Sequence, residues 1–159
     1  KELFGMLEQS SFEALRKDDH LLESVIARCI RVKANVVAQD EREGGLRRIL
    51  NLGHTIAHAI EKCSQRYSHG EAVAIGLHHI TKAALADGVI SEADGSRIIS
   101  LIERYGFDTE LPVERKLLLK AIEGDKKRKG NTIHLILPTA IGEVEDRVVK
   151  LAELSNYFV

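Results

Sequence analysis

Four polar side chains near the middle of the chain are spaced like residues on one face of a helix. Arg47, Asn51, His54 and His58 follow one another in steps of four, three and four residues, and at about 100° per residue they fall within about 60° of each other. Apolar residues of the same stretch occupy the opposite arc, so a helix can pack by that arc. Lys and Glu favour helix formation more than Asn or His and are more usual on a solvated face. The set therefore indicates a site, with a stripe of surface histidines as the alternative.

The spacing of His54 and His58 matches that of the two zinc-binding histidines in an HExxH motif. In that motif, a glutamate beside the first histidine is the general base of a metalloprotease. Residues 55–57 are Thr, Ile and Ala, so this chain lacks the base and the metalloprotease interpretation fails. One histidine of the pair can still bind a metal ion while the other contacts a substrate.

A third histidine lies at the start of the next predicted helix. Ser68 and Glu71 form the S-x-x-E pattern of a capping box, which assigns Glu71 a structural role rather than a catalytic one. His69 then occupies the first helical position, where the helix dipole keeps the imidazole neutral, as a metal ligand must be. Because residues 63–67 form a short connection, His69 can approach His54.

Two groups of cations have more than one interpretation. Lys33 lies on the edge of an apolar stripe, where its stem can extend to water or its ammonium can serve a site. The turn at residues 125–130 is basic, and such runs are usually solvated, although a cation in this turn can also reach a bound phosphate. We assign no role to the remaining histidines, which are His20, His78, His79 and His134.

The elements that position these residues are mainly helices. Apolar residues recur at three- and four-residue steps from residue 20 to residue 41, which predicts a long amphipathic helix that ends before Gly44 and Gly45. Alternating β-formers after Gly130 predict a hairpin over residues 131–149. Further helices are predicted at 3–7, 12–15, 46–62, 69–87 and 91–105 and from Pro112 onward, followed by a closing amphipathic segment at 151–158. The predicted fold class is therefore mainly α, with one small β-hairpin near the C-terminus.

The composition indicates one domain that is large enough to bury a core. The chain has 159 residues, 44% of them hydrophobic, and its 23 basic and 24 acidic side chains are dispersed. The sequence has no basic stripe for nucleic acid, no apolar run near the ~20 residues that cross a bilayer, and no secretory signal. Cys29 and Cys63 are far apart, the pattern of reduced thiols that pack as small hydrophobes in a cytoplasmic protein. The first residue is not Met, which indicates an excised piece.

Five stretches, in this order along the chain, resemble the C-terminal part of the 3-dehydroquinate synthase family of sugar phosphate cyclases. They are KANVV at 33–37 with DE at 40–41, RRILNLGHTIAHAIE at 47–61, HGEAVA at 69–74, DKK at 125–127 and IG at 141–142. The combination of NLGHTxxHAIE with HGEAVA is highly specific, and the resemblance covers essentially the whole chain. It implies a single helical metal- and substrate-binding domain over residues 1–159.

The resemblance implies an activity and a set of site residues. The family converts 3-deoxy-D-arabino-heptulosonate 7-phosphate to 3-dehydroquinate and phosphate, the second step of the shikimate pathway. It uses NAD transiently for oxidation and reduction around phosphate elimination and aldol ring closure, and zinc or cobalt polarises the reacting hydroxyl. Carried over by position, the metal ligands are His54 and His69. The catalytic and substrate-binding residues are Lys33, Arg47, Asn51 and His58, with Lys126, and secondarily Lys127, approaching the phosphate.

The resemblance also implies parts that this chain lacks. The family's third metal ligand is a glutamate in an AExxK motif upstream of residues 2–4, and an NAD-binding α/β domain precedes that motif. We therefore expect this chain to bind zinc weakly and to be inactive alone, and the full-length enzyme to be a homodimer. The exposed cleft face is expected to favour self-association.

Two other functions stay open. Another sugar phosphate cyclase, such as a 2-deoxy-scyllo-inosose synthase or an epi-valiolone synthase, would share the metal histidines but act on a substrate without a carboxylate. The combination of Arg47, Lys33, Asn51 and His58 favours an acidic substrate. The second alternative is a purely structural helical bundle. The expected partners are an acidic phosphorylated sugar and the missing N-terminal domain, with neither nucleic acid nor membrane.

Overall fold

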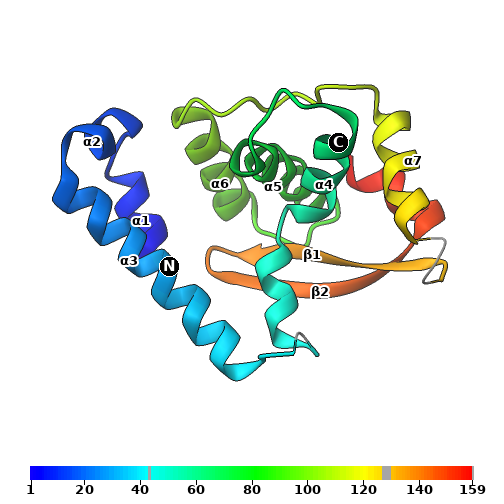
Figure 1. Ribbon diagram of the computed structural model, residues 1–159, viewed down its shortest axis with the longest axis horizontal. Helices are drawn as coiled ribbons and strands as arrows, with labels where there is room; N and C mark the ends of the chain where they lie inside the picture. Colours follow the sequence, from blue (N-terminus) through cyan, green and yellow to red (C-terminus); the bar gives the residue numbers. More distant parts are fainter. Residues whose placement is uncertain (43, 127–129, 159) are drawn as a thin grey trace.

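The computed structural model describes residues 1–42, 44–126 and 130–158, without the side chains of residues 125 and 126. Helices predominate, and an antiparallel hairpin follows them near the C-terminus (Figure 1). In chain order the elements are α1 (Glu2–Glu8), α2 (Phe12–Lys17), α3 (Asp19–Gln39), the 3-10 helix η1 (Leu46–Asn51), α4 (His54–Cys63), α5 (His69–Ala86), α6 (Glu92–Arg104), α7 (Arg115–Lys126), β1 (Thr132–Ala140), β2 (Glu143–Lys150) and the 3-10 helix η2 (Leu151–Tyr157). The predicted mainly α fold with one hairpin is confirmed.

Helix α5 lies at the centre of the fold and packs against α4, α6, β1 and η2. Its residues Ile75 and Ile80, and Ile56 and Ile60 of α4, expose 1% of their surface or less. Helix α7 covers another side of α4 with the fully buried Leu118. Because burial of apolar surface is the main favourable term in folding, this core holds α4 and α5 firmly side by side.

The hairpin predicted for residues 131–149 is confirmed, and it lies beneath the helices (Figure 1). The strands β1 and β2 pair in antiparallel register, with Ile133 opposite Val149. Leu135 and Leu137 of β1 are buried in the same core as α4 and α5. Gly142 occupies the turn with a φ of 84°, a conformation that glycine adopts without a steric cost. The hairpin therefore packs against one side of the central helices.

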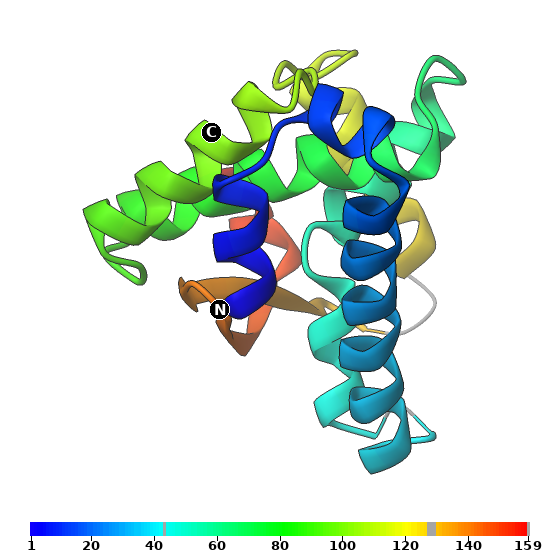
Figure 2. The same ribbon diagram turned by 90° about the vertical axis from the view of Figure 1, so that its left-hand side faces the viewer.

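Helix α3 extends along one side of the fold beside η1, and α1 and α2 pack against it (Figures 1 and 2). The helix predicted over residues 20–41 is confirmed, with the observed bounds Asp19–Gln39. Within the described residues, neither α3 nor another helix is both long and apolar enough to cross a membrane.

The apolar stripe of α3 is largely uncovered. Ile26, Ile30 and Val32 expose 48%, 63% and 54% of their surface, and Val36 is the buried residue of this helix. Cys29 is also exposed. The prediction that both thiols pack as small hydrophobes is therefore wrong for Cys29, because this face of α3 has no covering element in the described part of the chain.

The prediction of one continuous helix over residues 46–62 is wrong. The chain leaves η1, and Gly53 takes a left-handed φ of 77° immediately before α4 begins at His54. Gly53 also lies against α5, where a Cβ atom would come within 2.9 Å of the Leu77 nitrogen and 3.0 Å of the Val73 oxygen. Both the positive φ and the close approach require glycine. The predicted helix is interrupted at Gly53 because the backbone at this position lies directly against the backbone of α5.

Helix α7 starts later than the predicted position at Pro112. It begins at Arg115, and the carbonyl of Glu114 accepts the first hydrogen bonds of the helix, including one of 2.9 Å from the Leu117 N–H. Its buried side chains, Leu118 and Ile122, both follow this start. The contact with α4 therefore stabilises only the later part of the predicted segment.

Candidate metal centre

His54 begins α4 directly after the turn at Gly53. Its Nδ1 lies 3.0 Å from the carbonyl oxygen of Leu52, so the Nδ1–H tautomer donates a hydrogen bond to this carbonyl. That tautomer leaves a lone pair on Nε2. An imidazole that donates one N–H to a carbonyl or carboxylate and uses its other nitrogen for the metal is the usual arrangement in metal sites.

His69 is the first residue of α5, as predicted, and a capping box holds this end of the helix. The Ser68 hydroxyl accepts a hydrogen bond from the Glu71 N–H, and the Glu71 carboxylate accepts one of 2.8 Å from the Ser68 N–H. Hydrogen bonds from the Ser68 hydroxyl and N–H hold the pKa of Glu71 below its usual range. The capping role predicted for Glu71 is confirmed.

Three imidazoles meet where α4 approaches the start of α5. The ring centres lie 5.2 Å apart for His54 and His69, 5.7 Å for His54 and His58, and 6.1 Å for His58 and His69. Two imidazoles on one tetrahedral zinc ion, with Zn–N bonds of about 2.0–2.1 Å, have ring centres about 5 Å apart. The separation of His54 and His69 fits that value. Their assignment as metal ligands stays a prediction.

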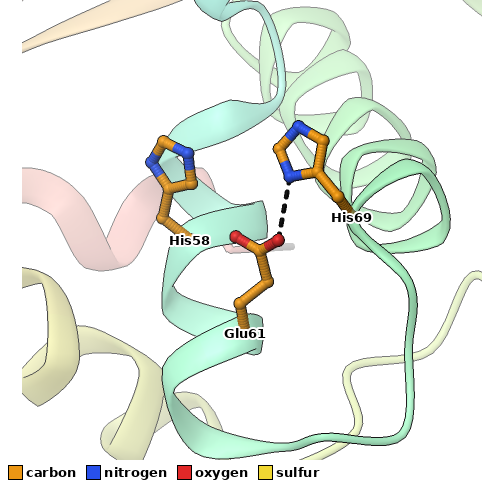
Figure 3. A group of neighbouring side chains, drawn as sticks. All are labelled: His58, Glu61 and His69. Atoms are coloured by element: carbon orange, nitrogen blue, oxygen red, sulfur yellow. Dashed lines mark hydrogen bonds and ion pairs between the residues drawn. The ribbon is translucent and has the colours of Figure 1, made fainter.

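Glu61 of α4 also belongs to this cluster, although it is not among the site residues predicted from the sequence. Its Oε1 lies 2.8 Å from Nδ1 of His69 (Figure 3). Ligand atoms of His58, Glu61 and His69 all lie within 4.8 Å of one another. The signal in the sequence was its spacing, three residues after His58 and seven after His54, which places it on the same helical face.

The environment of His58 favours its neutral form. Desolvation of the ring is the main cause that lowers its pKa; the Glu61 carboxylate opposes this shift, and His54 and His69 reinforce it. A cavity of about 90 Å³ lies beside His58 and is also lined by Lys62 of α4 and by residues of α7 and β1. Near neutral pH, this imidazole can therefore accept a proton from a group bound next to the cluster.

Arg47 and Asn51 do not share a helix with the histidines. Both lie on η1, and the turn at Gly53 separates η1 from α4, so the predicted stripe on one helix is wrong. Both side chains are half-buried, and the Arg47 guanidinium donates a 2.7 Å hydrogen bond to the Glu41 carbonyl. Helical spacing therefore does not set their position relative to the histidines.

Two of the predicted cations belong to helices other than the two that carry the histidines. Lys33 is exposed on α3, the helix that packs against η1. Lys126 is the last residue of α7, but its side chain and the whole of Lys127 lie outside the described residues. Their roles at the substrate stay predictions.

The four histidines without an assigned role lie elsewhere in the fold. His78 and His79 are buried within α5, with 7% and 6% of their surface exposed. His134 of β1 places Nδ1 2.7 Å from the carboxylate of Asp146. His20 is exposed near the start of α3.

The connection between α3 and η1 is organised by the carboxylate of Asp40. Its oxygens accept hydrogen bonds of 2.8 Å from the N–H groups of Gly44 and Gly45 and of 2.9 Å from that of Arg47. These three backbone hydrogen bonds, the one from Arg47 first, hold the pKa of Asp40 below its usual range. The charged carboxylate therefore holds the backbone of Gly44, Gly45 and Arg47 at the start of η1.

We expect Asp40→Asn to lower the melting temperature at pH 7 by about 3 °C, because the neutral amide has one acceptor oxygen in place of two and cannot accept all three hydrogen bonds. The folded-state pKa of Asp40 is below the unfolded value, so its contribution is present above about pH 4 and is lost as pH falls through the folded-state pKa. The variant should accordingly lose less stability than the parent on acidification from pH 5 to pH 2. Circular dichroism melts across this range measure both effects. Glu41→Gln, which removes the adjacent exposed carboxylate, is the control, and identical acid profiles for the two variants would contradict the role of Asp40.

Comparison with known proteins identifies the family. Residues 1–128 match the family model described as 3-dehydroquinate synthase C-terminal. The chain belongs to this family. The 3-dehydroquinate synthase of Thermodesulfovibrio yellowstonii is 39% identical over 149 residues, which cover 91% of this chain and 42% of that protein. The 3-dehydroquinate synthase of Pseudoalteromonas translucida is 43% identical over 147 residues, which cover 89% of this chain and 41% of that protein.

Solved structures of sugar phosphate cyclases share the fold of this 3-dehydroquinate synthase C-terminal chain. A 2-deoxy-scyllo-inosose synthase complexed with carbaglucose-6-phosphate, NAD+ and Co2+ superimposes with a TM-score of 0.74 at 26% identity, covering 88% of this chain and 41% of that one. The 2-epi-5-epi-valiolone synthase of Streptomyces hygroscopicus, with NAD+ and Zn2+ bound, gives a TM-score of 0.81 at 23% identity, covering 98% of this chain and 45% of that one. The latter similarity is one of fold.

This family membership confirms the resemblance to 3-dehydroquinate synthases that was based on the motifs NLGHTxxHAIE and HGEAVA. Both motifs lie within the matched residues 1–128, on the turn at Gly53, α4 and the start of α5. The chain spans less than half the length of the curated 3-dehydroquinate synthases described above, 42% and 41% of them.

Proposed function

We propose that this chain is the metal- and substrate-binding domain of a 3-dehydroquinate synthase. The enzyme would convert 3-deoxy-D-arabino-heptulosonate 7-phosphate to 3-dehydroquinate and phosphate, as a carbon–oxygen lyase of the shikimate pathway in the cytoplasm. The observation that carries the proposal is the meeting of His54 and His69, 5.2 Å apart between ring centres, inside the two motifs of the matched family.

The proposed metal is zinc or cobalt, held by Nε2 of His54 and of His69. When bound, such an ion polarises a substrate hydroxyl and the ketone formed from it. The chain's own contribution is to orient both rings, because the Leu52 carbonyl and the Glu61 carboxylate each accept from a Nδ1–H. Zinc and cobalt bound to solved relatives of the same fold support this choice of metal.

The other predicted residues would bind and orient the substrate. Arg47 and Lys33 are proposed to hold its carboxylate, since a guanidinium pairs with a carboxylate through two hydrogen bonds. Asn51 would bind its hydroxyl or carboxylate oxygens. His58, with its lowered pKa, would take up and return a proton near the phosphate end, where Lys126 approaches.

The proposed enzyme needs more than this domain. The curated relatives are more than twice as long as the matched region, and we propose that an N-terminal α/β domain supplies NAD, a third metal ligand from a glutamate, and further phosphate contacts. The exposed apolar side chains of α3, Ile26 and Ile30 among them, are available for contacts between domains or subunits. We further propose a homodimer for the complete enzyme.

The proposal predicts that the 159-residue chain binds zinc only weakly and releases no phosphate from 3-deoxy-D-arabino-heptulosonate 7-phosphate, even with NAD and zinc added. Two histidine ligands leave the coordination shell half filled by the protein. Isothermal titration with zinc and an inorganic phosphate assay measure the two results. The longer protein, with the NAD-binding domain attached, should release phosphate in the same assay. Turnover by the short chain, or a longer protein that is inactive on this substrate, would contradict the proposal.

The second candidate is a cyclase that acts on a substrate without a carboxylate. The shared fold and 26% identity with a 2-deoxy-scyllo-inosose synthase favour it. The two candidate functions differ in whether the substrate has a carboxylate, so the longer protein is tested with both the acidic substrate and glucose 6-phosphate. Phosphate release from glucose 6-phosphate alone would favour this candidate over the first, and absence of zinc binding would favour a structural bundle.

A further inference from the structure

Glu61 and His69 come from different helices and meet side chain to side chain. Glu61 lies in the second half of α4 with 33% of its side chain exposed, and His69 begins α5 with 56% exposed. The 2.8 Å contact joins Oε1 of the glutamate to Nδ1 of the imidazole, and Figure 3 shows the other ring nitrogen on the far side of His69. A carboxylate accepts hydrogen bonds and, when ionised, cannot donate. In the neutral imidazole, Nδ1 of His69 therefore carries the hydrogen, and Nε2 has the lone pair.

The same carboxylate has a second interpretation, as a metal ligand beside His58 and His69, because their ligand atoms lie within 4.8 Å of one another. Two ligand atoms on one tetrahedral ion with bonds of about 2.1 Å lie about 3.4 Å apart. The observed 2.8 Å between Glu61 and His69 is shorter and has the length of a charge-assisted hydrogen bond. The geometry therefore favours Glu61 as a partner of His69 over Glu61 as a ligand.

His54 has a hydrogen-bond acceptor at the same ring nitrogen. Its Nδ1 lies 3.0 Å from the Leu52 carbonyl, so a backbone acceptor sets the tautomer of His54 while a side-chain acceptor sets that of His69. The backbone acceptor cannot be removed by substitution, but the carboxylate can. Substitution of Glu61 consequently tests what sets the tautomer and orientation of His69.

We propose that Glu61 is a positioning residue, which holds His69 as the Nδ1–H tautomer and so presents its Nε2 to the same ion as His54. The metal part of this statement rests on the proposed function. The tautomer part does not, since it concerns the metal-free chain. Loss of such an acceptor beside a metal-binding histidine typically weakens metal binding about 10- to 100-fold.

Two substitutions at Glu61 distinguish three possible roles of its side chain: a hydrogen-bond acceptor for His69, a negative charge, and a metal ligand. Glu61→Gln keeps an oxygen that accepts from Nδ1–H, so it should retain the His69 tautomer and bind zinc within about 10-fold of the parent. Glu61→Ala removes the acceptor, so His69 should shift toward the Nε2–H tautomer and zinc affinity should fall about 10- to 100-fold. Glu71→Gln is the matched control, because this nearby carboxylate bonds to Ser68 instead.

Long-range ¹H–¹⁵N spectra of the metal-free 159-residue chain at pH 8 report the His69 tautomer, and a chelator competition titration reports zinc affinity. Circular dichroism verifies that each variant is folded. The proposal is overturned if His69 stays the Nδ1–H tautomer in Glu61→Ala. It is also overturned if Glu61→Gln and Glu61→Ala both lose as much zinc affinity as His69→Ala, which is the result expected if Glu61 is itself a metal ligand. Absence of zinc binding by the parent chain would refute the proposed metal centre, and the spectra would still decide whether Glu61 sets the tautomer.

Discussion

His69→Ala is expected to lower the zinc affinity of the chain by about 100-fold or more. An outer partner of a metal-binding histidine already contributes about 10- to 100-fold, and removal of the ligand itself should exceed that. His69 is also the residue common to both arrangements of the cluster, since it lies 5.2 Å from His54 between ring centres and within 4.8 Å of His58 and Glu61 between ligand atoms. Chelator competition measures the affinity, and phosphate release by the longer enzyme should fall in parallel.

Three further alanine variants make this result specific. His20→Ala, at an exposed position of α3, should leave zinc affinity unchanged. His54→Ala should resemble His69→Ala, whereas His58→Ala should stay within about 10-fold of the parent, because His58 is proposed to act on the substrate. The opposite order, with His58 essential and His54 dispensable, would assign the metal to His58, Glu61 and His69 instead.

Gly76→Ala is expected to destabilise the chain by about 3 kcal/mol or more. A Cβ atom at Gly76 would overlap the carbonyl oxygen of Gly53 and would lie 3.0 Å from the carbonyl carbon of Gly53. These are backbone atoms in a buried contact, so α4 and α5 must move apart to accept the methyl group. The same movement separates His54 from His69, and zinc affinity should therefore fall together with stability.

Urea unfolding at pH 7 measures the loss of stability, and the zinc titration is repeated at a temperature where the variant is folded. Gly70→Ala is the control in the same helix, because a Cβ there meets nothing within 4 Å and alanine favours the helix by up to about 1 kcal/mol. Gly76→Ala should thus lower the free energy of unfolding, whereas Gly70→Ala should raise it. Equal stability of the two variants would show that the backbone contact at Gly53 does not set the spacing of the helices.

Elements with local hydrogen bonding could be predicted from the sequence. The capping box of Ser68 and Glu71 sets the start of α5 through contacts three residues apart, and the hairpin follows from alternation around the turn at Gly142. Both depend on neighbouring residues, so short patterns contain the necessary information. His69 was placed correctly at the first position of its helix for this reason.

The break before His54 could not be predicted in the same way. Apolar spacing continues through residues 46–62, and an isolated glycine is compatible with a helix. The decisive interaction is the approach of Gly53 to Val73 and Leu77, which are about 20 residues away and belong to α5. For the same reason, the sequence pattern does not reveal that Arg47 and Asn51 belong to a different helix from the histidines.

The sequence by itself determined the chemistry of this protein: which imidazoles are available, that His54 and His58 share a helical face, and that a capped helix starts at His69. These properties follow from residue type and from spacings of three or four residues. Only the tertiary structure decided that His54 lies 5.2 Å from His69 between ring centres and that Glu61 is hydrogen-bonded to His69. Distances between different helices depend on how closely their backbones pack, and here two glycines, Gly53 and Gly76, permit that contact.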